Sequence, residues 1–125
     1  MSGLKERIIE KLRERKVKEN HKGFIYLLKA IEIFYKHEYR FDIKMGDVYT
    51  EIARETKEEP IKVNDAIRYV IRYVEGDEQE TISNRELIEE IVSELEIEDI
   101  FLKQERIRLG IDKWLNILKH QKELS

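Results

Sequence analysis

Between Pro60 and Val74, side chains that could do chemistry recur at helical spacing. At 100° per residue, Asp65, Arg68 and Arg72 would share one side of a helix. Arginine pairs with guanine through two N–H groups or binds phosphate, asparagine pairs with adenine, and an acidic side chain accepts from the amino group of cytosine. A solvated face of mixed charge is the other interpretation. The candidates for contact with DNA in this segment are Lys62, Asn64, Asp65, Arg68, Tyr69 and Arg72.

The sequence lacks the residue patterns typical of metal binding, catalysis or cofactor binding. The chain has no cysteine, and its three histidines have no spacing with carboxylates that would suggest a metal site. The neighbouring pairs Glu58–Glu59 and Glu89–Glu90 would point to different sides of a helix, so a catalytic dyad is not expected. No nucleophile with its base, glycine-rich phosphate loop or cofactor motif is present. We therefore expect no enzyme, no metal and no cofactor.

Length and composition indicate one helical domain, residues 1–125. Apolar and charged residues each make up 41% of the chain, with a single proline and five glycines. No apolar run reaches the length of a membrane span, and the amino-terminal residues lack the apolar stretch of a signal peptide. We expect no membrane association and a place in the cytoplasm.

The net charge of −3 hides a strong asymmetry along the chain. Residues 1–24 carry a net charge of +4, residues 25–76 of −1, residues 77–101 of −9 and residues 102–125 of +3. Any contact with DNA must therefore come from a local patch. The acidic run is expected to be a solvated face, or else a contact for a basic partner such as an RNA polymerase subunit.

Apolar periodicity predicts an all-α fold, a compact bundle of six to seven helices. The segment that follows the break at Gly23 is apolar almost all round, which is typical of a central buried helix. No segment alternates as a strand would. The predicted helices cover residues 4–18, 24–37, 47–56, 60–74, 83–98 and 101–121, the last interrupted at Gly110, with a connection or short helical turn before Gly46.

The helices 47–56 and 60–74, joined by a short turn, have the dimensions of a helix-turn-helix. Asp47 would cap the first, and Pro60 fits the first position of the second. Ala53 is small enough for a close crossing, and Val63 would meet it. The turn has Lys57 where glycine is frequent. Lys44, Thr50 and Lys62 are candidate phosphate contacts from this frame, and Lys22, which lies ahead of it in the sequence, is a further candidate for contact with DNA.

Three motifs carry a resemblance to a known family. "KGFIYLLKAI" matches a Lys-Gly-aromatic-x-Tyr-Leu-x-x-Ala-Ile signature, "VYTEIA" has Tyr49, Ile52 and Ala53 in the family's places, and "VNDAIRYVI" keeps the apolar core side together with Arg68. Residues 21–98 thus resemble the DNA-binding effector domain of the sporulation master response regulator, the bacterial stage-zero sporulation protein A. "SNRELIEEIVSELEIE" is similar to that domain's last helix.

The resemblance implies an all-helical fold whose helix-turn-helix enters the major groove, with Lys62, Asn64, Asp65 and Arg68 at the DNA surface. Two of these depart from the family, which has an acidic residue at Asn64 and a base-reading arginine at Asp65. The link after the second helix is shorter and acidic. No receiver domain precedes residue 1, so we expect a stand-alone regulator.

Residues 99–125 have no counterpart in the resemblance and are expected to be an extra helical extension. Its apolar residues form a stripe with two interpretations. Trp114 either fills the core of the domain, or the stripe pairs with a second copy and makes a homodimer.

The leading hypothesis is a sequence-specific DNA-binding transcriptional regulator of the sporulation-effector type, with double-stranded DNA and RNA polymerase subunits as partners. The alternative is a protein-interaction module, or antagonist, that kept the fold and lost DNA reading.

Overall fold

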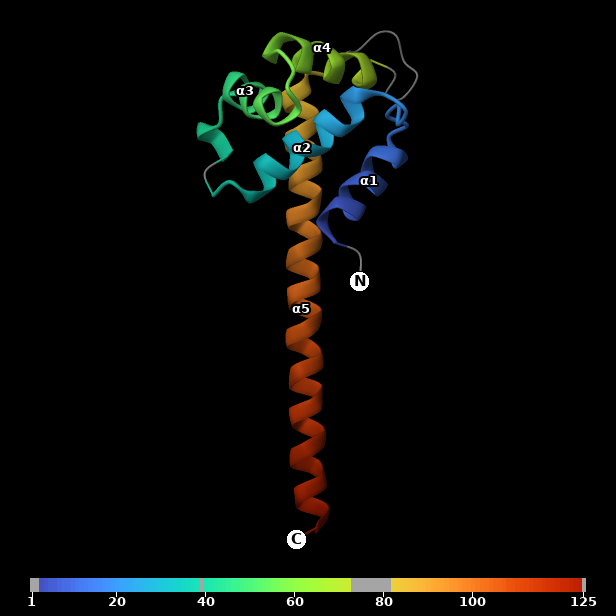
Figure 1. The fold of residues 1–125 in the computed structure, drawn as a ribbon. Helices are drawn as coiled ribbons and strands as arrows, with labels where there is room; N and C mark the ends of the chain where they lie inside the picture. The colour runs from blue at the N-terminus through green and yellow to red at the C-terminus, as the bar shows by residue number, and fades with distance from the viewer. Residues whose placement is uncertain (1–2, 39, 73–81, 125) are drawn as a thin grey trace. The chain divides into compact units, whose positions relative to one another are not determined.

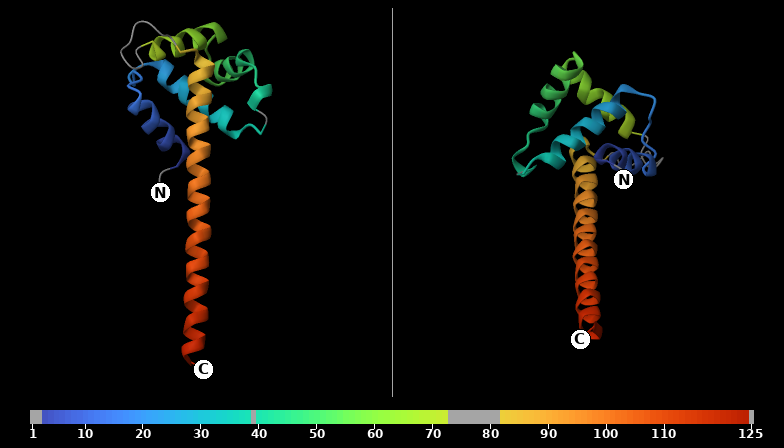
Figure 2. Two further views of the ribbon diagram at one scale, coloured as in Figure 1. Left: turned by 180° about the vertical axis from the view of Figure 1, so that it is seen from behind. Right: turned by 60° about the horizontal axis from the view of Figure 1, so that its bottom comes forward.

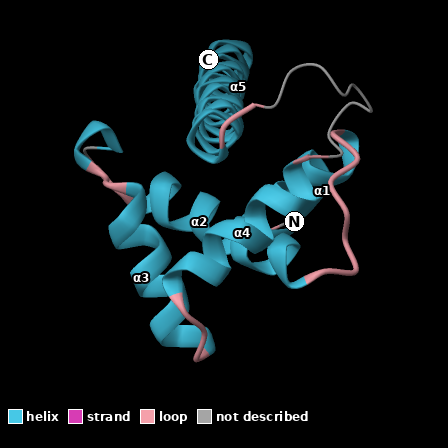
Figure 3. Ribbon diagram, turned by 90° about the horizontal axis from the view of Figure 1, so that it is seen from above, coloured by secondary structure: helices cyan, strands magenta, loops and turns pink. Residues whose placement is uncertain are grey.

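The computed structural model describes residues 3–38, 40–72 and 82–124 (Figure 1). The described chain consists of helices joined by loops, with no strand in these ranges (Figure 3). It divides into two compact units, residues 1–93 and residues 94–125.

The predicted all-α class is confirmed. The elements are α1 (Leu4–Glu14), α2 (Lys22–Lys36), a 3₁₀ turn (Arg40–Asp42), α3 (Met45–Thr56), α4 (Pro60–Ile71) and α5 (Asn84–Leu124). The described residues thus hold five α-helices, fewer than the six to seven expected. The two helices expected over 83–98 and 101–121 are one helix of 41 residues, and Gly110 does not interrupt it. Glycine inside a helix costs only about 1 kcal/mol relative to alanine, which a long helix tolerates.

In the first unit α2 is the central helix, as its sequence predicted. It packs against α1, α3 and α4, and α1 and α3 lie on opposite sides of it (Figures 1 and 2). Its inward side chains are almost completely buried because they pack against these neighbouring helices. The start of α5 adds further buried side chains to this unit. The core residues of α2 and of the start of α5 are Phe24, Tyr26, Leu27, Ala30, Ile31, Phe34, Leu87, Ile88, Ile91 and Val92.

Gly23 has a different role from the one predicted. It lies inside α2 and is buried, so it is not the flexible point of a break. A β-carbon at this position would lie 2.0 Å from the carbonyl oxygen of Ala66 and 2.6 Å from its carbonyl carbon. Glycine is needed here because the backbones of α2 and α4 cross too closely for any side chain.

Two helices of the first unit end on a lysine in the left-handed conformation. Lys16 has φ of 59° and Lys57 has φ of 58°. The N–H of Val17 donates to the carbonyl oxygen of Leu12 at 3.0 Å. The N–H of Glu58 donates to the carbonyl oxygen of Ala53 at 2.9 Å. These six-to-one bonds satisfy helix-end carbonyls that would otherwise lack donors. They also explain why α1 ends at Glu14 and not near Lys18, as periodicity alone predicted.

Lys57→Gly is expected to stabilise the protein by about 1 kcal/mol, because an L-residue pays about that much for the left-handed conformation. Urea unfolding monitored by circular dichroism would measure the change. Lys62→Gly is the matched control: this exposed lysine lies inside α4, and its replacement should cost about 0.5–1 kcal/mol. Equal losses in both variants would contradict the assignment of Lys57 as the residue that closes α3.

The predicted helix starts are partly right. Pro60 is the first residue of α4, as expected. Ser83 caps α5, since its hydroxyl accepts a bond from the Glu86 N–H at 3.1 Å. The expectation that Asp47 caps α3 is wrong: the helix begins at Met45, with Lys44 at the cap position. Asp47 lies in the first turn instead, where its negative charge interacts favourably with the positive end of the helix dipole.

Arg85 ties the start of α5 to the chain ahead of α3. Its guanidinium donates to the carbonyl oxygens of Ile43 at 2.6 Å and Arg40 at 3.2 Å, and to Glu89 at 2.9 Å. The same group lies over the ring of Phe34, 5.5 Å from its centre. These charge-assisted bonds fix the entry into α3.

The interpretation that Trp114 of the extension fills the core of the domain is wrong. Trp114 is 65% exposed, so it does not fill a core. The unit is a single helical stretch, and one helix alone offers its apolar side chains nothing to pack against.

Candidate nucleic-acid interface

The two faces of α4 are the ones that helical periodicity predicted. Val63, Ile67, Val70 and Ile71 are buried against the core. Val74, which helical spacing places on the same side as Val63 and Val70, lies outside the described residues. Asp65, Arg68 and Arg72, which are predicted to share the outward side, are exposed, and Ile61 on that side has 66% of its surface accessible. The exposed outward residues are Ile61, Lys62, Asp65, Arg68 and Arg72.

The two helices of the expected unit pack together, and the residues expected at their crossing are buried. Ala53 of α3 is 4% exposed and Val63 of α4 is fully buried, and the two helices pack together. Three residues, 57–59, separate Thr56 from Pro60. A rigid pair of helices therefore holds the outward face of α4 in place.

Asn64 has a partner inside the protein that sequence reasoning missed. The buried side chain of Asn84 donates through Nδ2 to Oδ1 of Asn64 at 2.9 Å and to the hydroxyl of Tyr49 at 2.9 Å. Burial raises the pKa of Tyr49, against the effect of the Asn84 hydrogen bond and the charge of Arg68. This network links α3, α4 and the start of α5, and it holds the Asn64 amide in one orientation. Only the position of Asn84, directly after the cap at Ser83, hinted at a role for it.

Tyr69 lies on the flank of α4, where it meets the connection between α1 and α2. Its ring contacts His21 edge to face with centroids 5.1 Å apart, and the ammonium of Lys18 lies 5.3 Å from the ring centre. This contact brings basic residues from another part of the chain to the side of α4. Sequence reasoning did not select Lys18, since nothing in the local pattern of residues 15–20 indicates a contact 51 positions away.

The remaining candidates, Lys44, Thr50 and Lys22, have different surroundings. Lys44 is exposed at the start of α3. The hydroxyl of Thr50 donates to the carbonyl oxygen of Gly46 at 2.8 Å, so a contact with phosphate requires its hydroxyl to turn. Lys22 lies 3.8 Å from the carboxylate of Glu58, which offsets part of its charge.

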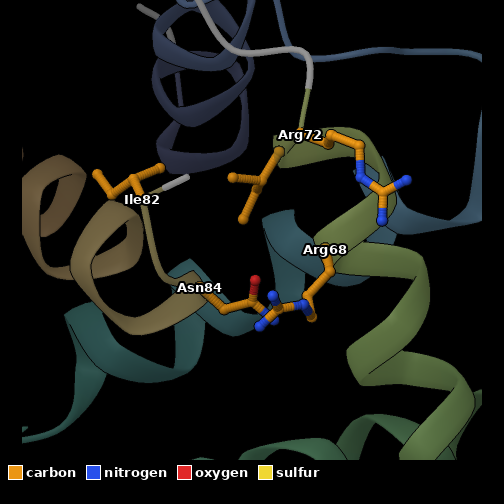
Figure 4. A pocket seen from close by; sticks show the side chains of 5 residues that line it. Arg68, Arg72, Ile82 and Asn84 are labelled. Carbon is orange, nitrogen blue, oxygen red and sulfur yellow. The ribbon is translucent and has the colours of Figure 1, made fainter. Parts of the chain in front are cut away.

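A small pocket lies at the end of α4 (Figure 4). Arg68, Arg72 and Asn84 line it together with two isoleucines, Ile71 and Ile82. Its volume of about 70 Å³ is far below the several hundred Å³ of a ligand or cofactor site. The chemistry of α4 therefore belongs to its outer surface, where two guanidinium groups stand one helical turn apart.

The described residues contain no group of three or more histidine, cysteine, aspartate or glutamate side chains placed to hold a metal ion. None of the described helices is long and apolar enough to cross a membrane.

Comparison with protein families decides what this arrangement belongs to. The model of the family described as "Sporulation initiation factor Spo0A C terminal" matches residues 8–96, which is more than two thirds of the chain. The chain belongs to this family. No curated protein matched in a further search.

The Spo0A C-terminal family is a family of DNA-binding effector domains in the regulation of transcription during sporulation, and it is not an enzyme family. The chain is therefore a DNA-binding regulator in general terms. The match begins at Ile8, so it includes α1 from this residue onward as well as the motifs that start at Lys22. Residues 97–125 lie beyond it.

Proposed function

We propose that the protein is a sequence-specific transcriptional regulator that places α4 in the major groove of double-stranded DNA. The observation that carries the proposal is the arrangement of α4: the apolar side chains of its core side are buried where α3 and α4 pack together, and Arg68 and Arg72 on its opposite side are exposed. A recognition helix needs this arrangement, because side chains reach base edges only from a helix that the rest of the domain holds firmly.

The candidate residues take separate roles in the proposal. Arg68 and Arg72 make the main contacts with bases or phosphates, and Asn64 and Asp65 set the sequence preference. Tyr69 supports the flank of the helix. Lys62, Lys44, Thr50 and Lys22 contact phosphates and fix the register of α4 in the groove.

The domain organisation and remaining partners complete the proposal. Residues 1–125 form a regulator with an effector part, residues 21–98 and the helix before it, and an extension over 99–125. RNA polymerase subunits are proposed as protein partners through the acidic run 77–101, of which residues 77–81 lie outside the described residues. The proposed place in the cytoplasm follows from the DNA partner.

A selection of binding sites from random duplex DNA tests this function. We expect an enriched motif and a binding constant that falls with salt, with a log–log slope corresponding to several phosphates. Arg68→Ala combined with Arg72→Ala should weaken binding to the enriched site by about 10- to 100-fold, because one good base contact is worth about 1–3 kcal/mol.

The matched control is Arg106→Ala, which removes an exposed arginine outside the family part. It should leave binding to the enriched site within about twofold of the unmodified protein. No enrichment at low salt, or a double variant that binds as well as the control, would contradict DNA reading by α4.

Two residues favour the second candidate, a protein-interaction module. Ile61 is 66% exposed on the same face of α4 as Asp65, whose charge is repelled by phosphates. An apolar side chain beside an acidic one suits a protein surface better than DNA. This candidate predicts that the selection yields no motif, and that the module acts as an antagonist through this face.

A further inference from the structure

The second unit carries large apolar side chains that nothing covers. Six of them are isoleucine, tryptophan or leucine residues with between 50% and 65% of their surface exposed. They belong to one uninterrupted helix, which by itself cannot bury them. These six, named here the stripe residues, are Ile97, Ile100, Ile107, Ile111, Trp114 and Leu118.

The spacing of the stripe residues is that of a coiled coil. Starting from Ile97, alternate steps of three and four residues reach every one of them in turn, and the only polar residue on the way is Gln104. This 3–4 repeat keeps one seam of a helix facing a partner helix. Leu102 and Leu109 are exposed to the same degree but lie outside the repeat, so exposure alone does not define the stripe.

The distribution of charge along the segment favours one relative orientation of two paired helices. Residues 94–99 carry a net charge of −4, whereas residues 100–124 carry +3. Two parallel copies would align acidic with acidic and basic with basic residues. Two antiparallel copies bring the acidic start of one beside the basic end of the other, which charge attraction and the opposed helix dipoles both favour.

Gln104 and Trp114, the two residues of the repeat that are not isoleucine or leucine, also favour antiparallel copies. In the antiparallel register with the longest overlap, Gln104 shares a layer with Trp114 of the second copy, and Ile107 shares one with Ile111 of the second copy. A buried tryptophan needs an acceptor for its indole N–H, and the glutamine side-chain oxygen provides one. Parallel copies would place Trp114 against Trp114 and Gln104 against Gln104.

We propose that residues 97–121 form an antiparallel coiled coil with the same segment of a second copy of this chain. The partner is thus this protein itself, and the seam consists of the stripe residues together with Gln104 and, opposite Ile97, Gln121. The inference is independent of DNA binding by α4, and its test requires no DNA.

Sedimentation equilibrium of the full chain over a range of concentrations tests the pairing. We expect a dimer, and Ile107→Asp combined with Ile111→Asp should raise its dissociation constant on the order of 100-fold or more, because charges would enter the seam. Leu102→Asp combined with Leu109→Asp is the matched control and should leave the dissociation constant within about threefold. A monomer at every concentration, or an equal effect of the two pairs, would overturn the proposal.

Disulfide formation tests the direction, since the chain has no cysteine of its own. Ile100 and Leu118 share a layer only when the copies are antiparallel. A mixture of the Ile100→Cys and Leu118→Cys variants should form a mixed disulfide dimer under mild oxidation, whereas each variant alone should stay largely unlinked. Efficient linking of each variant with itself would show parallel copies and overturn the antiparallel pairing.

Discussion

Gly23→Ala is expected to lower the free energy of unfolding by about 3 kcal/mol, a large part of the 5–15 kcal/mol that keeps a typical domain folded. The added β-carbon would overlap the Ala66 carbonyl group, at 2.0 Å from its oxygen and 2.6 Å from its carbon. These are backbone atoms of α4, so no rotamer change relieves the clash. Either α4 moves away from α2 or the unit unfolds.

A loss of stability in Gly23→Ala would be the opposite of the usual effect of this substitution. Within a helix, glycine to alanine normally stabilises by about 0.5–1 kcal/mol, so a loss reports the close crossing directly. Gly46→Ala is the control, because a β-carbon at Gly46 would meet nothing within 4 Å. Urea unfolding should show unchanged or raised stability for Gly46→Ala. The same outcome for Gly23→Ala would contradict the crossing of α2 and α4 described above.

Asp65→Arg is expected to tighten DNA binding by about 10- to 100-fold. Asp65 is exposed on the outward face of α4, and its family resemblance places a base-reading arginine at this position. The change swings the charge by two units and adds a side chain able to pair with guanine, a contact worth about 1–3 kcal/mol. The log–log salt slope should also steepen by about one phosphate if the new arginine contacts the backbone.

Fluorescence anisotropy with duplexes from a fresh selection would measure both the affinity and the sequence preference of Asp65→Arg. Asp112→Arg makes the same charge change on an exposed residue beyond the family part, so it corrects for the effect of net charge alone. We expect it to change affinity by less than about threefold at physiological salt. Equal gains from the two variants would contradict a place for residue 65 at the DNA surface.

The sequence predicted the faces of α4 well because a residue's position on a helix follows from its number alone. The all-helical class followed from the same periodicity, and the family motifs pointed to a match that the comparison confirmed. The end of α1 was predicted less well, because a left-handed lysine at residue 16 closes it and lysine carries no signal for that conformation. The pattern predicts an interruption at Gly110 because the local cost of glycine in a helix is visible in the sequence, whereas the stability of the surrounding helix is not.

Contacts between residues far apart in the chain could not be predicted from the sequence. The crossing at Gly23 depends on Ala66, and the position of Asn64 depends on Asn84, yet neither pair has a local pattern that reveals it. Core packing is one of the two interpretations that the sequence allows for Trp114, but burial requires a partner surface, and the helix that carries Trp114 offers none within its own unit.

The bond from Asn84 to Asn64 has a consequence for how this regulator could acquire new targets. A substitution at residue 64 would also break a buried network that joins three helices, so natural selection would meet a stability cost there before any gain in recognition. Ile61, Lys62, Asp65 and Arg68 are exposed positions on the same helix and can be exchanged at lower cost. A laboratory library for retargeting should randomise these four codons and keep residue 64 as asparagine.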